Sequence, residues 1–235
     1  EIAARQALAA SPDRVELAVE LARGDIQRYH ELSDPRYLGR AQATLGRWWK
    51  LAEPPPDVLL LRATIEQAIH QFPEARADLD HLIRVRPDDA QALLTRAVIA
   101  TITADYAAAR DSCRAVAPLS NPIVLATCEA PIDGLAGKAD EAYARLAKLV
   151  IAVRAGDAGV RGWALTALAE LAYMRGDTDA AMAHLSSALA IDAEDAYARN
   201  LLADLLMATG HTADASKMLA GREQIDSHLV RRAIA

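Results

Sequence analysis

The chain has 235 residues and a formal net charge of −6; apolar types fill 52% of its positions, but aromatic residues only 4%. Fifty-three residues are alanine, which favours helices because it loses no side-chain entropy in them. A β-sandwich or barrel would need more β-branched and aromatic residues, and glycine and proline are too few for a disordered or collagen-like chain. We therefore expect an all-α fold.

Membrane-spanning and nucleic-acid-binding proteins are both disfavoured. The longest uncharged stretch, Ala115–Cys128, is too short to span a bilayer and is interrupted by prolines. There is no basic run of five residues, and the charge balance is acidic, so we expect no nucleic-acid partner. The first residue is Glu1 rather than methionine, which is expected either of a shortened chain or of a protein whose export signal has been removed.

In chain order, a long helix over about residues 12–32 is followed by a repeated pattern of alanine, three residues and a larger apolar residue. Between successive copies the alanines are separated by 34, 34, 33, 39 and 34 positions. The pattern occurs at Ala41/Leu45, Ala75/Leu79, Ala109/Cys113, Ala142/Leu146, Ala181/Leu185 and Ala215/Leu219.

Glycine and proline mark the turns between the expected helices. Gly176 and Gly210 stand 34 positions apart between the helices of two pairs, and prolines such as Pro122 open new helices. We expect Pro131 to kink or end its helix, and the spacing of 39 to reflect a longer loop over about 151–160. The segment 222–235 is expected to cap the end of the array.

The period and the alanine pattern resemble the tetratricopeptide repeat family, whose unit is a 34-residue helix-turn-helix. The resemblance covers about residues 13–221 and implies an α-solenoid, a right-handed superhelix in a single domain over residues 1–235, as in bacterial proteins of this type. The expected units are 13–53, 54–87, 88–121, 122–156, 160–195 and 196–221, with the cap at 222–235.

No catalytic or metal-binding motif accompanies the repeats. The six histidines form neither an HxxxH nor a Cys/His metal spacing, and no GxSxG, P-loop or GxGxxG occurs. Acidic pairs such as Asp88-Asp89 precede helices, where negative charge is favourable. We therefore expect no enzyme, no cofactor and no metal.

The two cysteines, Cys113 and Cys128, lie on consecutive helices that would pack side by side. One interpretation is a structural disulfide, which would indicate an exported, periplasmic protein. The alternative is two small buried apolar residues in a cytoplasmic protein. We favour the disulfide.

The resemblance implies that the first helix of each unit lines a concave groove that binds a peptide or protein. The family's best-known grooves bind a C-terminal carboxylate with Lys, Arg and Asn. That mode is disfavoured, because those positions here carry Leu60, Thr64, Leu94, Val98, Asn200 and Asp204. Core packing is an equally good interpretation of Leu94 and Val98. The expected groove residues are Leu60, Thr64, Leu94, Val98, Trp163, Glu170, Tyr173, Tyr197, Asn200 and Asp204.

The leading hypothesis is a non-enzymatic adaptor or scaffold for a protein or peptide partner. The alternative is a small-molecule-binding or transport-accessory protein with an enclosed apolar pocket. A solenoid enzyme would need titratable groups to meet around Glu170, Asn200 and Asp204, and has little support. The aromatic residues could equally serve a homodimer.

Overall fold

The computed structural model describes residues 2–152 and 157–220. Within these ranges the secondary structure is helical and no strand is present. The chain forms two compact units, Glu1–Ile99 and Ala100–Ala235, and each is described by itself. The all-α prediction is confirmed; the prediction of a single domain stays a prediction.

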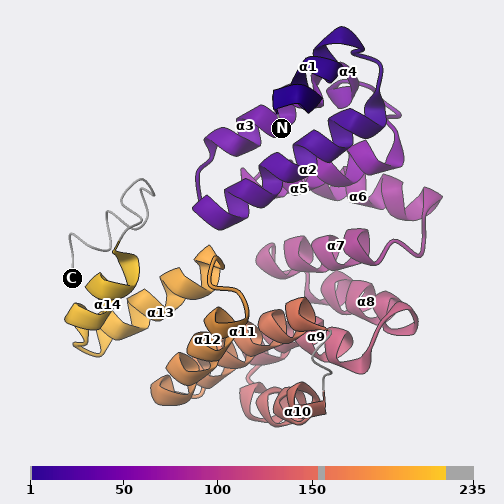
Figure 1. The fold of residues 1–235 in the computed structure, drawn as a ribbon. Helices are drawn as coiled ribbons and strands as arrows, with labels where there is room; N and C mark the ends of the chain where they lie inside the picture. The colour runs from indigo at the N-terminus through magenta and orange to yellow at the C-terminus, as the bar shows by residue number, and fades with distance from the viewer. Residues whose placement is uncertain (1, 153–156, 221–235) are drawn as a thin grey trace. The chain divides into compact units, whose positions relative to one another are not determined.

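The first unit consists of seven helices, the last of which ends three residues inside the second unit. Helices α2 and α3, and α5 and α6, pack against each other as pairs (Figure 1). The helices are α1 (Ile2–Ala10), α2 (Val15–Leu32), α3 (Arg36–Thr44), α4 (Gly46–Trp49), α5 (Pro56–Ala68), α6 (Phe72–Val85) and α7 (Ala90–Ile102).

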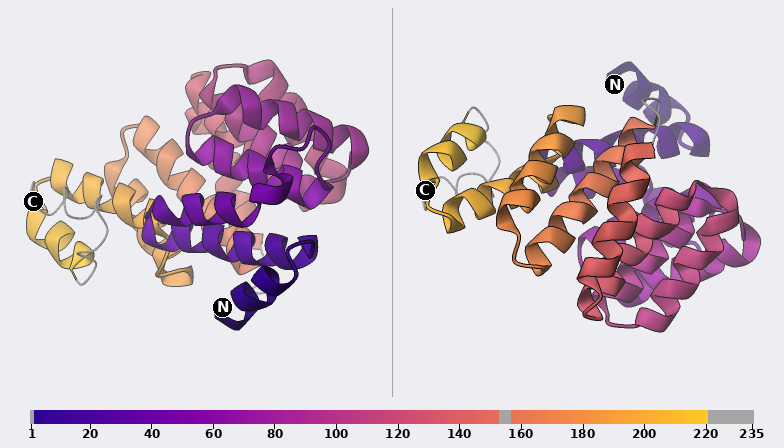
Figure 2. Two further views of the ribbon diagram at one scale, coloured as in Figure 1. Left: turned by 90° about the horizontal axis from the view of Figure 1, so that it is seen from above. Right: turned by 90° about the horizontal axis from the view of Figure 1, so that it is seen from below.

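In the second unit, three pairs follow α8, namely α9/α10, α11/α12 and α13/α14, and each pair also packs against the next (Figure 2). Its elements are α8 (Tyr106–Val116), the 3₁₀ helix η1 (Ala117–Leu119), α9 (Pro122–Leu135), α10 (Ala139–Ala152), α11 (Ala158–Met174), α12 (Thr178–Ile191), α13 (Ala196–Ala208) and α14 (Thr212–Leu219).

The repeated alanine pattern forms the centre of both cores. All twelve of its residues are at most 1% exposed, from Ala41 and Leu45 in the first unit to Ala215 and Leu219 in the second. Alanine at these positions lets two helices approach closely, and the leucine one turn later fills the space beside the contact. The repeated pattern therefore marks where the helices pack against each other.

One turn geometry recurs at the end of α5, α7, α9, α11 and α13. In each case a residue with positive φ is followed by a backbone N–H that donates to the carbonyl five residues earlier, at 2.8–2.9 Å, as in a Schellman motif. Three of the positive-φ residues are glycines (Gly137, Gly176 and Gly210), but the other two are His70 and Ala104. The two helices of each of these pairs are therefore connected by the same backbone geometry.

Aspartates cap four of the described helices. Asp105 and Asp177 each accept a hydrogen bond from the backbone N–H three residues later, at the start of α8 and α12. Asp89 and Asp195 do the same at the start of α7 and α13. These bonds satisfy N–H groups that a helix leaves without an internal partner.

Two irregularities are expected from the sequence, a kink or helix end at Pro131 and a longer loop over about 151–160. Helix α9 does not end at Pro131 but runs on to Leu135, because its packing against α8, α10 and α11 compensates for the backbone bond that proline cannot make. The extra residues of the 39-residue spacing lie mainly in α11, which has 17 residues against 13 in α13. The expected longer loop over about 151–160 stays a prediction, because residues 153–156 lie outside the described residues. The expected cap at 222–235 lies outside the described residues.

Buried aspartates tie neighbouring helices together. Asp25 of α2 is 2% exposed and pairs with Arg5 of α1 and Arg40 of α3. Asp133 of α9 accepts hydrogen bonds from Arg110 of α8 and Arg145 of α10, both at 2.7 Å. Burial alone would raise the pKa of Asp133, but these two arginines hold it below its usual value. Each aspartate thus fixes three helices.

Candidate functional site

The first helices of the last two pairs, α11 and α13, present aromatic side chains to solvent. Trp163, Glu170 and Tyr173 fall on one side of α11, because seven and ten residues bring a helix back to within about 20° and 80° of its starting direction. Trp163 is 38% and Tyr173 58% exposed, whereas Glu170 is half-buried.

Helix α13 repeats this arrangement with Tyr197, Asn200 and Asp204. Tyr197 is 60% exposed, and its hydroxyl donates a hydrogen bond to Glu170 Oε1 at 2.5 Å. Asn200 and Asp204 follow at helical spacing and are half-buried. We call these six residues of α11 and α13 the α11–α13 face.

The polar groups of the α11–α13 face are partly desolvated. Burial raises the pKa of the Glu170 carboxyl, and the hydrogen bond from Tyr197 offsets part of that rise. Burial, with the neighbouring carboxylate, also raises the pKa of the Tyr197 hydroxyl. The side-chain oxygen of Asn200 is buried and accepts no hydrogen bond from a described residue. Such acceptors gain from a donor that a partner brings.

The remaining predicted groove residues lie in the first unit. Leu60 of α5 is half-buried and packs against the apolar core around Leu79, and Thr64 donates its hydroxyl hydrogen bond to the carbonyl of Leu60. On α7, Leu94 is half-buried and Val98 is 44% exposed. Leu60 thus contributes to the core. The prediction that these residues and the α11–α13 face line one groove stays a prediction.

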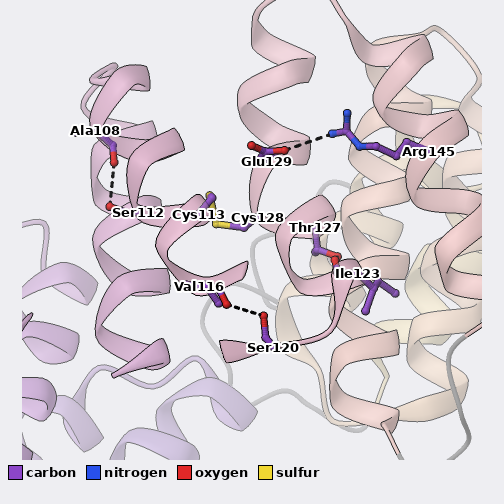
Figure 3. Close-up of a disulfide and its surroundings, with 10 residues drawn as sticks. All are labelled: Ala108, Ser112, Cys113, Val116, Ser120, Ile123, Thr127, Cys128, Glu129 and Arg145. Atoms are coloured by element: carbon purple, nitrogen blue, oxygen red, sulfur yellow. Dashed lines mark hydrogen bonds and ion pairs between the residues drawn. A yellow bond between two sulfur atoms is a disulfide. The ribbon is translucent and has the colours of Figure 1, made fainter. Parts of the chain in front are cut away.

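Cys113 of α8 and Cys128 of α9 form a disulfide in the structure, with Cα atoms 5.7 Å apart (Figure 3). Both residues are buried, at 0% and 7% exposure. Hydroxyl groups nearby, on Ser112, Ser120 and Thr127, bond to backbone carbonyls four residues earlier. The disulfide joins α8 to α9.

Exposed apolar residues at the ends of α9 and α11 were not predicted as a group. Leu135 is 56% and Met174 45% exposed, and a methyl group on Gly134 would lie 2.5 Å from the sulfur of Met174. Glycine at position 134 thus allows Met174 to lie directly against α9. Leu135 and Met174 are 39 positions apart, which is the repeat spacing at this point of the chain. This spacing could have revealed that the two residues occupy equivalent positions.

The described residues show neither a candidate metal site nor a helix that could span a membrane. They contain no group of three or more His, Cys, Asp or Glu side chains that could hold a metal ion. No helix among them is long and apolar enough to cross a bilayer. A shallow hollow of about 350 Å³ lies among α1, α3 and α4, lined by residues that include Arg5, Leu8 and Trp48. None of the predicted groove residues lines it.

The helix pairs, their common turn and the buried alanines define an α-solenoid fold of tetratricopeptide type. Residues 172–228 match the family model described as "Tetratricopeptide repeat". No curated protein shows a significant match to the sequence. The resemblance to this family is thus confirmed.

Solved structures of tetratricopeptide repeat proteins share the fold. One from Parabacteroides merdae aligns with a TM-score of 0.65 and 14% identity, over 98% of this chain and 89% of that one. A thermophilic protein from Thermus thermophilus aligns with a TM-score of 0.56 and 18% identity, over 81% and 99%. A chain of the APC/C Cut9–Hcn1 hetero-tetramer aligns with a TM-score of 0.61 and 11% identity, over 98% of this chain and 44% of that one. These similarities support the α-solenoid fold.

Proposed function

We propose that this protein is a non-enzymatic adaptor that binds a peptide or protein partner through the α11–α13 face, on the exported side of a bacterial membrane. The single observation that carries the proposal is the exposure of Trp163, Tyr173 and Tyr197 on that face. The sequence has only ten aromatic residues, and aromatic side chains contribute disproportionately to protein interfaces. The tetratricopeptide fold, which also occurs in the Cut9–Hcn1 complex, is consistent with such a role.

The compartment is part of the same proposal. A disulfide persists in an oxidising environment such as the periplasm and is rare in the cytosol. The bond between Cys113 and Cys128 therefore favours an exported protein over a cytoplasmic one.

The decisive experiment is affinity capture with matched variants. The double variant Trp163→Ala/Tyr197→Ala removes two partly exposed rings, so the fold should be kept, with a cooperative thermal transition, while partner capture is lost. The variant Tyr106→Ala is the control, because Tyr106 is 40% exposed on α8, outside the α11–α13 face. If the double variant captures the same partner as the wild type, the α11–α13 face is not the binding surface. A wild-type protein that captures only itself would indicate a homodimer instead.

A further inference from the structure

The α11–α13 face combines aromatic rings with hydrogen-bond acceptors. The three exposed rings belong to Trp163, Tyr173 and Tyr197, and the acceptors are Glu170 and the unpartnered oxygen of Asn200. Tyr197 links the two sets, because its hydroxyl lies on the Glu170 carboxylate. Asp204 lies one helical turn beyond Asn200 and is half-buried. Glu170 therefore places a carboxylate beside the electron-rich surfaces of aromatic rings.

The cationic side chains of the described helices α9, α11 and α13 lie away from Glu170. Helix α9 contains no Lys or Arg, and α11 and α13 contain one each. Arg161 lies about 180° around α11 from Glu170, since nine residues separate them. Arg199 lies about 160° around α13 from Tyr197; it is 4% exposed and donates to the carbonyl of Ala193. Both arginines are thus directed away from the face.

From this arrangement we infer that the α11–α13 face takes a cationic side chain, arginine in particular, from the bound peptide. The inference rests on the proposed function and specifies which chemistry the face selects. A guanidinium group can donate to a carboxylate and an amide oxygen at once, and can lie against an aromatic ring. The face offers all three kinds of contact.

Competing side chains fit the same groups less well. An acidic residue would place a second negative charge beside Glu170, which is already partly desolvated. An apolar residue could cover the rings but would leave the oxygen of Asn200 without a donor and Glu170 further removed from water. The preference for a cation therefore comes from repulsion of the alternatives as well as from attraction.

The test uses random-sequence dodecapeptides with one fixed central residue. The probes are five fluorescent pools, acetylated and amidated at their ends, in which the fixed residue is arginine, lysine, citrulline, norleucine or glutamate. Citrulline has the shape of arginine but no charge, so the ratio between these two pools isolates the charge. Binding to the full chain is followed by fluorescence anisotropy up to about 1 mM protein.

We expect the arginine pool to bind at least tenfold more tightly than the citrulline pool, with lysine between them. Glu170→Gln should reduce the ratio below threefold, because the amide still accepts from Tyr197 but carries no charge. The control is Glu141→Gln, which removes an exposed charge on α10. It should leave the ratio of arginine to citrulline binding unchanged. Equal binding of the arginine and citrulline pools, or no binding by any pool, overturns the inference.

This outcome is separate from the test of the proposed function. In one outcome, partner capture depends on Trp163 and Tyr197 while the pools show no preference for arginine. That result supports the α11–α13 face as the binding surface and contradicts its selectivity for a cation. If a clear arginine preference survives in the Trp163→Ala/Tyr197→Ala variant, the cation binds somewhere else on the chain, and the inference is wrong.

Discussion

Tyr197 of α13 and Glu170 of α11 are joined by a hydrogen bond from the tyrosine hydroxyl to the carboxylate. The bond connects the first helices of two successive pairs at the surface where the aromatic residues are exposed. It therefore fixes the position of the one carboxylate of α11 that lies among those rings.

Removal of this hydroxyl should change the titration of Glu170. The hydrogen bond lowers the pKa of Glu170 against the larger effect of burial, which raises it. In Tyr197→Phe the pKa of Glu170 should therefore rise further above its ordinary value. NMR titration of the carboxyl carbon measures this directly, and Tyr173→Phe is the control. A pKa of Glu170 that is unchanged in Tyr197→Phe would show that the bond does not persist in solution.

The two non-glycine residues in the recurring turn should be sites of stabilising substitution. His70 and Ala104 have φ values of 63° and 61°, where a side chain costs roughly 1–2 kcal/mol. Glycine removes this cost but gives the unfolded chain more freedom, so His70→Gly and Ala104→Gly should each stabilise the fold by about 0.5–1 kcal/mol. Denaturant unfolding measures the change.

Two matched variants should destabilise the fold if the positive φ is the cause of the stabilisation. Gly176→Ala introduces a methyl group that has nothing within 4 Å, so its cost of about 1 kcal/mol would be conformational alone. Ala183→Gly makes the same substitution as Ala104→Gly inside α12 and should destabilise by about 1 kcal/mol. A destabilised Ala104→Gly would mean that the turn relaxes out of the positive-φ conformation in solution.

The buried carboxyl of Glu66 should make the stability of the fold depend on pH near neutrality. Glu66 is 7% exposed, and Oε2 has no hydrogen-bond partner among the described residues. Burial raises the pKa of Glu66 to about 7, the charge of Asp78 adds to the rise, and Arg62 opposes it. Since the folded pKa exceeds the ordinary value of 4.5, the folded state binds the proton more tightly. Stability is therefore greatest below about pH 4.5 and is lost as pH rises to about 7.

Glu66→Gln should remove this dependence. Relative to the wild type, the variant should gain on the order of 1–3 kcal/mol in free energy of unfolding between pH 4.5 and 8, as measured by urea denaturation. Asp133→Asn is the control of opposite sign: the arginines lower the pKa of Asp133, so the wild type gains stability above the ordinary pKa and loses it in acid. Parallel pH profiles for wild type and Glu66→Gln would contradict the role given to Glu66.

The repeat made the fold predictable, whereas the details depend on contacts between residues distant in the sequence. Ala181 and Leu185 belong to the repeated spacing that could be read from the sequence, and both are buried. The start of α11 was missed because the glycine-containing stretch over about 151–160 suggested a loop, whereas α11 begins within that stretch at Ala158. The turn at Ala104 was missed because only glycine signals a positive φ in a sequence.

The candidate site was predictable only in part, for the same reason. The helical spacing of Trp163, Glu170 and Tyr173 places them on one side of α11, but nothing local indicates that Tyr197 reaches Glu170. The pairing of Arg5 with Asp25 is likewise invisible in the sequence, since it depends on how α1 folds back onto α2. Side-chain partners between helices thus require the structure.

The disulfide between Cys113 and Cys128 supplies the last prediction. It closes a loop with a sequence separation of 15, for which the loss of freedom in the unfolded chain is worth about 3 kcal/mol. Reduction should therefore lower the free energy of unfolding by that amount, whereas the Cys113→Ala/Cys128→Ala variant should not respond to reductant. Thiol titration of denatured protein from its native cells then tests the proposed compartment. An exported protein should show no free thiol, and two reactive thiols would place it in a reducing environment.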